Sequence, residues 1–168
     1  AHVIKEFLLN SQKNIGEHQY VVDFIHEKCQ QLCTKCSMDK TPSLLELKYL
    51  VHLVAHCSGE LKPNYDWLDC INALHPTPAV AGTPCEIALD YITKKEPFSR
   101  GWYAGPMGTI SKRNAKIVVA IRSGMVKGDS VILGAGAGIV ADSNPEDEWN
   151  ELDAKINVFS TLFNKDSL

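Results

Sequence analysis

The chain has 168 residues, 45% of them hydrophobic, which is the size and composition of one globular domain with an apolar core. Its formal net charge is −3 and no basic cluster runs along a predicted helix, so nothing points to nucleic acid as a partner. No apolar run approaches the roughly 18 residues of a membrane span, and the first residues are unlike a signal peptide. We therefore expect no membrane partner and a cytoplasmic protein, or a plastid protein if the source is a photosynthetic eukaryote.

The first third of the chain is predicted to be mainly helical. Residues 11–16 have the character of a loop, and a helix with an apolar face follows from Glu17 to about Cys33. Glu17 then lies in the first turn, where the helix dipole stabilises a carboxylate. Taken alone, this carboxylate is explained by stabilisation of the helix N-terminus.

A predicted turn at residues 38–43 leads through a short apolar and polar segment into Tyr49–Ala55, which has the composition of a buried strand. His52 lies in the middle of this strand. A single buried histidine is most often a satisfied core residue, and that is its simpler interpretation. Residues 59–64 are expected to break the strand.

The middle of the chain continues with a predicted helix at Tyr65–Leu74 and another at Glu86–Lys94. Between them, residues 75–84 contain three prolines, so this segment is stiff and poor in backbone donors. Such a loop keeps one shape and can form the wall of a pocket.

From residue 101 the pattern is typical of β structure. Strands are predicted at residues 101–105, 116–123 and 130–133, which together form an antiparallel meander. Arg122 directly follows an apolar run, a position typical of a charge on an edge strand or of a guanidinium that meets an anion. The local patterns therefore predict helices in the first part of the chain and antiparallel strands after them.

The chain has six cysteines, which is enough for a metal site. Cys29, Cys33 and Cys36 have helical spacing and superficially resemble a cluster for a soft metal. No fourth ligand follows at a zinc-like interval. The other three are expected to sit singly in apolar or loop surroundings: Cys57, Cys70 and Cys85. We therefore expect reduced, structural thiols.

A glycine-rich stretch at Gly134–Gly138 follows the last strand. Alternating glycines leave the backbone bare, so an anionic ligand can approach the peptide N–H groups closely, although glycines also mark simple bends. Ser143 stands three residues before Glu146, which is the spacing of a capping box, and Pro145 suits a first helical turn. A helix is therefore predicted to start here.

On that helix, Glu148, Glu151 and Lys155 share one face because they are three and four residues apart. Two adjacent carboxylates suit a hard cation such as Mg²⁺, which typically takes one or two protein carboxylates. Lys155 would then hold an anion beside the metal. The alternative is an ordinary exposed ion pair between Glu151 and Lys155.

Several motifs together carry a family resemblance. They are Ser11-x-Lys13 with Glu17-His18, His52-Leu53-Val54, His75-Pro-Thr-Pro-Ala-Val-x-Gly82-x-Pro84, Arg100-Gly-Trp-Tyr-Ala-Gly105, Ile121-Arg122-Ser123, and the glycine-rich strand with its acidic helix. They occur in the order seen in the chorismate-utilising enzymes. The chain resembles the C-terminal part of that family, and within it most closely the isochorismate synthases.

The resemblance implies an α/β fold of the α+β kind, in which antiparallel sheets are flanked by helices. It also implies a site for chorismate and one Mg²⁺. Residues matching metal ligands are Glu17 and Glu151, with Glu148 beside them. Positions matching substrate-binding residues are Ala79, Tyr103, Arg122, Gly136, Ala137, Gly138 and Lys155. Among these, Tyr103 and Arg122 would hold the enolpyruvyl carboxylate, while backbone N–H groups of the glycine-rich stretch and Lys155 would serve the ring carboxylate. His52 matches a histidine beside the reacting ring, which makes it the catalytic candidate.

Ala79 bears on the subclass, because relatives that eliminate pyruvate or use ammonia usually have threonine there. The implied reaction is isomerisation of chorismate to isochorismate, with a general base, a general acid and Mg²⁺. The alternatives are a salicylate synthase, a component of anthranilate or aminodeoxychorismate synthase, or a non-catalytic chorismate-binding remnant. The product could enter menaquinone, salicylate or siderophore biosynthesis.

The base and acid of the family lie upstream of the motif that matches Glu17. We therefore expect residues 1–168 to form a partial chorismate-binding domain, inactive alone, whose partner is the N-terminal half of the same enzyme. An isolated half would expose a sheet face and tend to associate.

Overall fold

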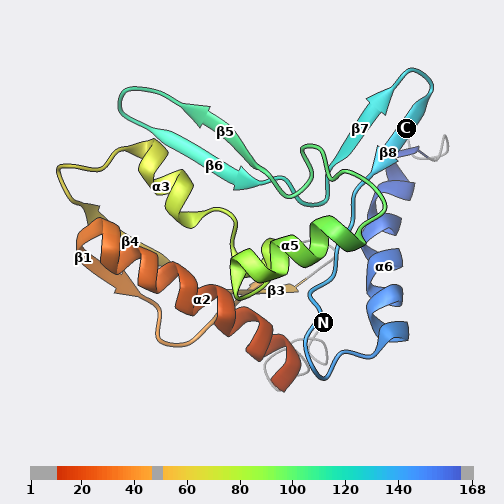
Figure 1. The fold of residues 1–168 in the computed structure, drawn as a ribbon, viewed down its shortest axis with the longest axis horizontal. Helices are drawn as coiled ribbons and strands as arrows, with labels where there is room; N and C mark the ends of the chain where they lie inside the picture. Colours follow the sequence, from red (N-terminus) through yellow and green to blue (C-terminus); the bar gives the residue numbers. More distant parts are fainter. Residues whose placement is uncertain (1–10, 47–50, 164–168) are drawn as a thin grey trace. The chain divides into compact units, whose positions relative to one another are not determined.

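The computed structural model describes residues 11–46 and 51–163, and it divides the chain into two compact units, residues 1–90 and 91–168. Figure 1 shows helices mixed with short antiparallel strand pairs, as expected of an α+β fold. In the part of the chain that the structure describes, no helix is long and apolar enough to cross a membrane. Unit 1 comprises residues 1–90 and unit 2 comprises residues 91–168.

The first described helix of unit 1, α2, spans Gln12–Leu32 and begins before the predicted start. The hydroxyl of Ser11 accepts a hydrogen bond from the backbone N–H of Asn14 at 3.3 Å, which caps the helix and draws residues 12–16 into it. The prediction of a loop at residues 11–16 was therefore wrong. Glu17 lies in the second turn instead of the first, so the helix dipole is a weaker reason for its presence.

Unit 1 also contains two antiparallel strand pairs. Strand β1 (Cys33–Met38) pairs with β4 (Cys57–Leu61), and β2 (Ser43–Glu46) pairs with β3 (Val51–Val54). The predicted strand at residues 49–55 is confirmed as β3 for its described part, while Tyr49 and Leu50 lie outside the described residues.

The predicted break at residues 59–64 was placed too late, because β3 already ends at Val54 and Gly59 lies inside the next strand, β4. A Cβ at this position would lie 2.6 Å from the Sγ of Cys33 and 2.9 Å from the carbonyl oxygen of Lys35. Glycine is therefore required by close approach of neighbouring atoms inside a strand.

Three helices complete unit 1: α3 (Trp67–Leu74), α4 (Pro78–Ala81) and α5 (Cys85–Lys95), the last of which continues past the unit boundary. The carboxylate of Asp66 caps α3 by accepting hydrogen bonds from the N–H groups of Leu68 and Asp69. The proline-rich segment at residues 75–84 is not wholly a loop, because Pro78 opens the one-turn helix α4.

Unit 2 contains two separate strand pairs and a C-terminal helix. Strand β5 (Pro106–Ile110) pairs with β6 (Ala115–Val119), and β7 (Gly124–Lys127) pairs with β8 (Ser130–Leu133). The predicted single meander is corrected to two two-stranded sheets within the described residues. Residues 101–105 form turns, not the predicted strand.

The helix α6 (Pro145–Phe163) starts at the predicted proline, but a different residue caps it. The side-chain oxygen of Asn144 accepts hydrogen bonds from the N–H groups of Glu146 and Asp147, at 2.9 and 3.3 Å. Ser143 instead accepts a hydrogen bond from the N–H of Val140 at 3.1 Å. The proposed capping box between Ser143 and Glu146 was therefore wrong, because an asparagine one residue later satisfies the same donors.

Large apolar side chains are widely exposed in the described structure. Every residue of β5 and β7 is exposed, and Trp102 retains 83% of its accessible surface. The buried apolar residues that the structure describes are small or few: Cys29, Leu32, Ala81, Ala104 and Ala120. Association through these exposed side chains stays a prediction.

Candidate functional site

Unit 2 brings Tyr103 against the glycine-rich segment. A Cβ at Gly134 would lie 2.4 Å from the Cδ2 of Tyr103, and a Cβ at Gly136 would lie 2.8 Å from its hydroxyl oxygen. Both distances are shorter than real Cβ contacts, so these two positions require glycine if the ring is to stay in place. Burial raises the pKa of the Tyr103 hydroxyl, so at neutral pH it stays protonated and can donate a hydrogen bond.

The turn that carries Tyr103 is anchored by an ion pair that the sequence reasoning missed. The guanidinium of Arg100 donates two hydrogen bonds to the carboxylate of Glu96, from Nε at 2.8 Å and from Nη2 at 2.5 Å. The backbone N–H of Tyr103 donates to the carbonyl of Arg100 at 2.9 Å. These hydrogen bonds from Arg100 lower the pKa of Glu96, although burial opposes the shift. The four-residue spacing of Glu96 and Arg100 was the signal that could have revealed them.

Arg122 lies at a backbone corner beyond β6. Its φ is 48°, in the left-handed region that non-glycine residues rarely adopt. The hydroxyl of Ser123 donates to the carbonyl of Ala120 at 3.0 Å, which holds this corner in shape. Backbone strain of this kind is typical of residues that a fold positions for a purpose, and Arg122 was predicted to meet an anion here.

Backbone hydrogen bonds join the segments that carry these residues. Ala120 forms two backbone hydrogen bonds with the turn that carries Tyr103. Its N–H donates to the carbonyl of Gly105 at 2.9 Å, and its carbonyl accepts from the N–H of Ala104 at 3.0 Å. The N–H of Gly134 donates to the carbonyl of Ser123 at 2.9 Å. The corner of Arg122, the turn of Tyr103 and the start of the glycine-rich stretch therefore form one connected region.

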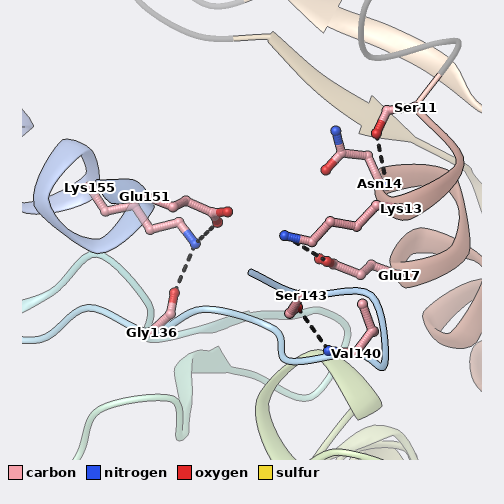
Figure 2. Close-up of polar contacts among 9 residues, drawn as sticks. All are labelled: Ser11, Lys13, Asn14, Glu17, Gly136, Val140, Ser143, Glu151 and Lys155. Carbon is pink, nitrogen blue, oxygen red and sulfur yellow. Dashed lines mark hydrogen bonds and ion pairs between the residues drawn. The ribbon is translucent and has the colours of Figure 1, made fainter. Parts of the chain in front are cut away.

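Helix α6 adds charged groups to this region. Figure 2 shows Lys155 pointing from α6 to the carbonyl oxygen of Gly136, to which its ammonium donates at 2.8 Å. The same ammonium pairs with a carboxylate oxygen of Glu151 at 2.5 Å. The predicted i,i+4 pair is therefore present, and it is also fastened to the glycine-rich backbone. Ala137 and Gly138 continue that backbone immediately after Gly136.

Glu148 lies one turn before Glu151 on α6. It is 5% exposed, and among the described residues it is the charged residue that is buried. Burying a carboxylate costs free energy unless positive charge or hydrogen-bond donors compensate it. Glu151 retains 46% of its side-chain surface. Two carboxylates three residues apart on one helix match the oxygen donors that Mg²⁺ prefers, so this donor set fits the metal that the resemblance implies.

The remaining predicted residues belong to unit 1. Glu17 is half-buried and lies 3.8 Å from the ammonium of Lys13 one turn earlier on α2 (Figure 2). His52 lies on β3 opposite Leu45, and Ala79 is an exposed residue of α4. The participation of Glu17, His52 and Ala79 in the same site as the unit 2 residues stays a prediction.

His18, beside Glu17, is a further residue with unusual surroundings. Its Nε2 is buried and has no hydrogen-bond partner among the described residues, and burial lowers the pKa of its imidazole. A neutral histidine next to a predicted metal ligand was not given a role from the sequence, where it was only part of a motif.

Comparison with known proteins places these features in a family. Residues 1–164 match the family described as chorismate binding enzyme. The chain is 43% identical over 150 residues to isochorismate synthase MenF of Bacillus subtilis, covering 89% of the chain and 32% of that protein. It is 35% identical over 158 residues to anthranilate synthase component 1 of Saccharolobus solfataricus, covering 92% of the chain and 37% of that protein.

Among solved structures, the menaquinone-specific isochorismate synthase MenF of Escherichia coli matches with a TM-score of 0.84 and 37% identity. That match covers 96% of this chain and 37% of the other. The chain thus spans about a third of the length of the curated relatives it matches. Because the family match covers nearly the whole chain, the chain belongs to the chorismate binding enzyme family.

Proposed function

We propose that this chain is the C-terminal portion of an isochorismate synthase and supplies most of its chorismate and Mg²⁺ site. The proposal rests on the connected region of unit 2. There Tyr103 packs against the glycine-rich segment, Arg122 has a strained backbone, and Lys155 donates a hydrogen bond to the backbone of Gly136. Chorismate has two carboxylates, and each needs cationic or N–H partners in a site that excludes water. Tyr103 and Arg122 suit one of them, and Lys155 with the glycine-rich backbone suits the other.

The carboxylates of α6 are the proposed metal ligands. Glu148 and Glu151 would hold one Mg²⁺, and the family resemblance adds Glu17 from α2. When bound, Mg²⁺ would polarise the ring carboxylate and neutralise its charge. Besides binding the ring carboxylate, Lys155 would orient Glu151, because its ammonium donates hydrogen bonds to both Glu151 and the carbonyl of Gly136.

The proposed reaction moves a hydroxyl group around the ring. A water oxygen bonds to one ring carbon and gives its proton to a general base, while the hydroxyl on another carbon leaves with a proton from a general acid. Atoms and charge balance, because one water enters and one leaves. We place the base and acid in a part of the protein outside this chain and His52 beside the reacting ring, so the chain alone is expected to be inactive.

A second candidate is a different chorismate enzyme. The match to anthranilate synthase component 1 favours it, because the same residues can hold chorismate for another reaction. Ala79, exposed on α4, is the residue that separates the two: the resemblance associates alanine with isochorismate formation and threonine with elimination or amination. A third candidate is a chorismate-binding protein without activity.

Product analysis of the whole protein that contains this chain tests the proposal. We expect chorismate to give isochorismate with Mg²⁺ and no conversion after the metal is chelated. Formation of salicylate or of an aminated product would replace the proposal with the second candidate. Binding of chorismate without turnover would favour the third.

A pair of arginine variants tests the assignment of the site. Arg122→Met should weaken chorismate binding about 10- to 100-fold, the loss expected for charge-assisted hydrogen bonds to a carboxylate. Arg113→Met is the matched control, since Arg113 is exposed in the turn between β5 and β6 and should bind like the parent. Equal binding by both variants would remove Arg122 from the site.

A further inference from the structure

Unit 1 gathers cysteine sulfurs from three elements, the helix α2 and the strands β1 and β4. One ligand atom each from Cys29, Cys36 and Cys57 lies within 4.8 Å of the others, and the Sγ atoms of Cys36 and Cys57 are 3.9 Å apart. All six cysteines are free, and Cys29 is buried. The expectation that Cys57 would sit singly was therefore wrong, because strand pairing brings it back to the first cysteine group.

The fold explains how these sulfurs meet. Cys29 lies in the last turn of α2, and β1 begins directly after that helix, so the chain turns back beside its own helix end. Strand β4 then pairs with β1 and places Cys57 opposite Met38, two positions along from the pairing of Cys36 with Gly59. The three thiols therefore face one small space between a helix end and a two-stranded sheet.

Cys33 borders the same space. A Cβ at Gly59 would lie 2.6 Å from the sulfur of Cys33 and 3.0 Å from the sulfur of Cys29, so both sulfurs crowd the room that a side chain there would need. Cys33 is also a side-chain contact of Cys29. A fourth sulfur is thus available beside the three, while Cys57 is the ligand that the spacing in the sequence did not reveal.

We propose that Cys29, Cys36 and Cys57, with Cys33 as the fourth ligand, form a binding site for a thiophilic divalent cation, best matched by Zn²⁺. A tetrahedral site with Zn–S bonds of about 2.3 Å requires sulfurs about 3.8 Å apart. The observed 3.9 Å between Cys36 and Cys57 is close to this value, and the sulfur of Cys29 lies within 4.8 Å of both, so these three need only small side-chain movements. Soft thiolates select such ions over Mg²⁺, so this site would not compete for the metal of α6.

The proposed site is distinct from the chorismate site. Cys29 lies twelve residues after Glu17 on the same helix, which is about 18 Å along its axis at 1.5 Å per residue. An ion here would fasten the end of α2 to the β1 and β4 pair and stabilise unit 1 without touching substrate. It would be a structural ion.

Metal titration of the whole protein that contains this chain, freshly reduced and desalted, tests the site. We expect one Zn²⁺ or Co²⁺ per chain, and Co²⁺ should give thiolate-to-metal charge-transfer absorption. X-ray absorption of the Zn²⁺ form should show at least three sulfur neighbours at about 2.3 Å. Saturation at a thousandfold excess over Kd should raise the melting temperature by on the order of 10 °C.

Variants locate the ion. Cys57→Ser should weaken Zn²⁺ binding at least about 100-fold, whereas Cys85→Ser, the matched control at the start of α5, should bind as the parent does. Absence of stoichiometric binding by the parent chain would overturn the proposal, and so would a coordination sphere of oxygen and nitrogen. Binding of Zn²⁺ by Cys57→Ser as tightly as by the parent would overturn it as well.

Discussion

Gly134→Ala tests whether the glycine-rich segment is shaped by the ring of Tyr103. The new Cβ would lie 2.4 Å from Cδ2 and 3.0 Å from both Cε2 and Cγ of that ring. Three contacts with a rigid aromatic side chain cannot be relieved by a small rotation, so the ring or the backbone must move. Overpacking of this kind costs about 1–3 kcal/mol, and we expect a loss of that size in the free energy of unfolding.

A double-mutant cycle with Tyr103→Ala separates this steric effect from a general backbone effect. Denaturant unfolding of the parent, both single variants and the double variant gives the coupling between the two sites. With the ring removed, Gly134→Ala should cost only a few tenths of a kcal/mol, so the coupling should be about 1–2 kcal/mol. An equal cost in both backgrounds would refute the contact as the reason for glycine.

Three further predictions concern stability. Glu96→Gln should lower the free energy of unfolding by roughly 1 kcal/mol at pH 7, since the side chains of the Arg100 pair are 28% exposed and partly screened. Because the pKa of Glu96 is lowered, this contribution is fully present above the usual pKa of about 4.3 and is lost as pH falls through the lowered pKa. Thermal unfolding of parent and variant should therefore converge at acidic pH, below the lowered pKa. Burial also lowers the pKa of His18, so its neutral form stabilises the fold above about pH 6.5, and this stability is lost as pH falls. His18→Gln should therefore flatten the pH dependence of the denaturation midpoint below about pH 6.5. An unchanged slope would count against this role of His18. Gly16→Ala should stabilise by about 0.5–1 kcal/mol in the same assay, because Gly16 is inside α2 with open space around it; a loss of stability would contradict the helix assignment.

Much of the secondary structure followed from local patterns. The helix after the proline segment and the strand before the glycines were predicted within a residue or two, because periodicity and turn residues act locally. The start of α2 was missed because Ser11 was treated as a loop residue and not as a helix cap. The cap of α6 was assigned to Ser143 by its spacing, although Asn144 is an equally good cap and lies nearer.

The candidate site was predictable from the sequence only in part. Arg122, Glu151 and Lys155 could be picked out from their positions at a strand end and on one helix face. The contact of Lys155 with Gly136 joins residues 19 positions apart, and no spacing rule gives such a contact. The same holds for the sulfurs of Cys36 and Cys57, which meet only because β1 pairs with β4. Long-range pairing is therefore the part that the sequence patterns left open.

The most direct test of the chorismate site is the Mg²⁺ dependence of chorismate binding by the whole protein, measured by calorimetry for Glu151→Gln. Asp153→Asn is the control, because this exposed acid on the same helix is two residues away and faces elsewhere. We predict that Glu151→Gln binds chorismate weakly and identically with and without Mg²⁺, while Asp153→Asn keeps the full Mg²⁺ dependence of the parent. Retention of that dependence by Glu151→Gln would contradict the assignment of the α6 carboxylates to the metal.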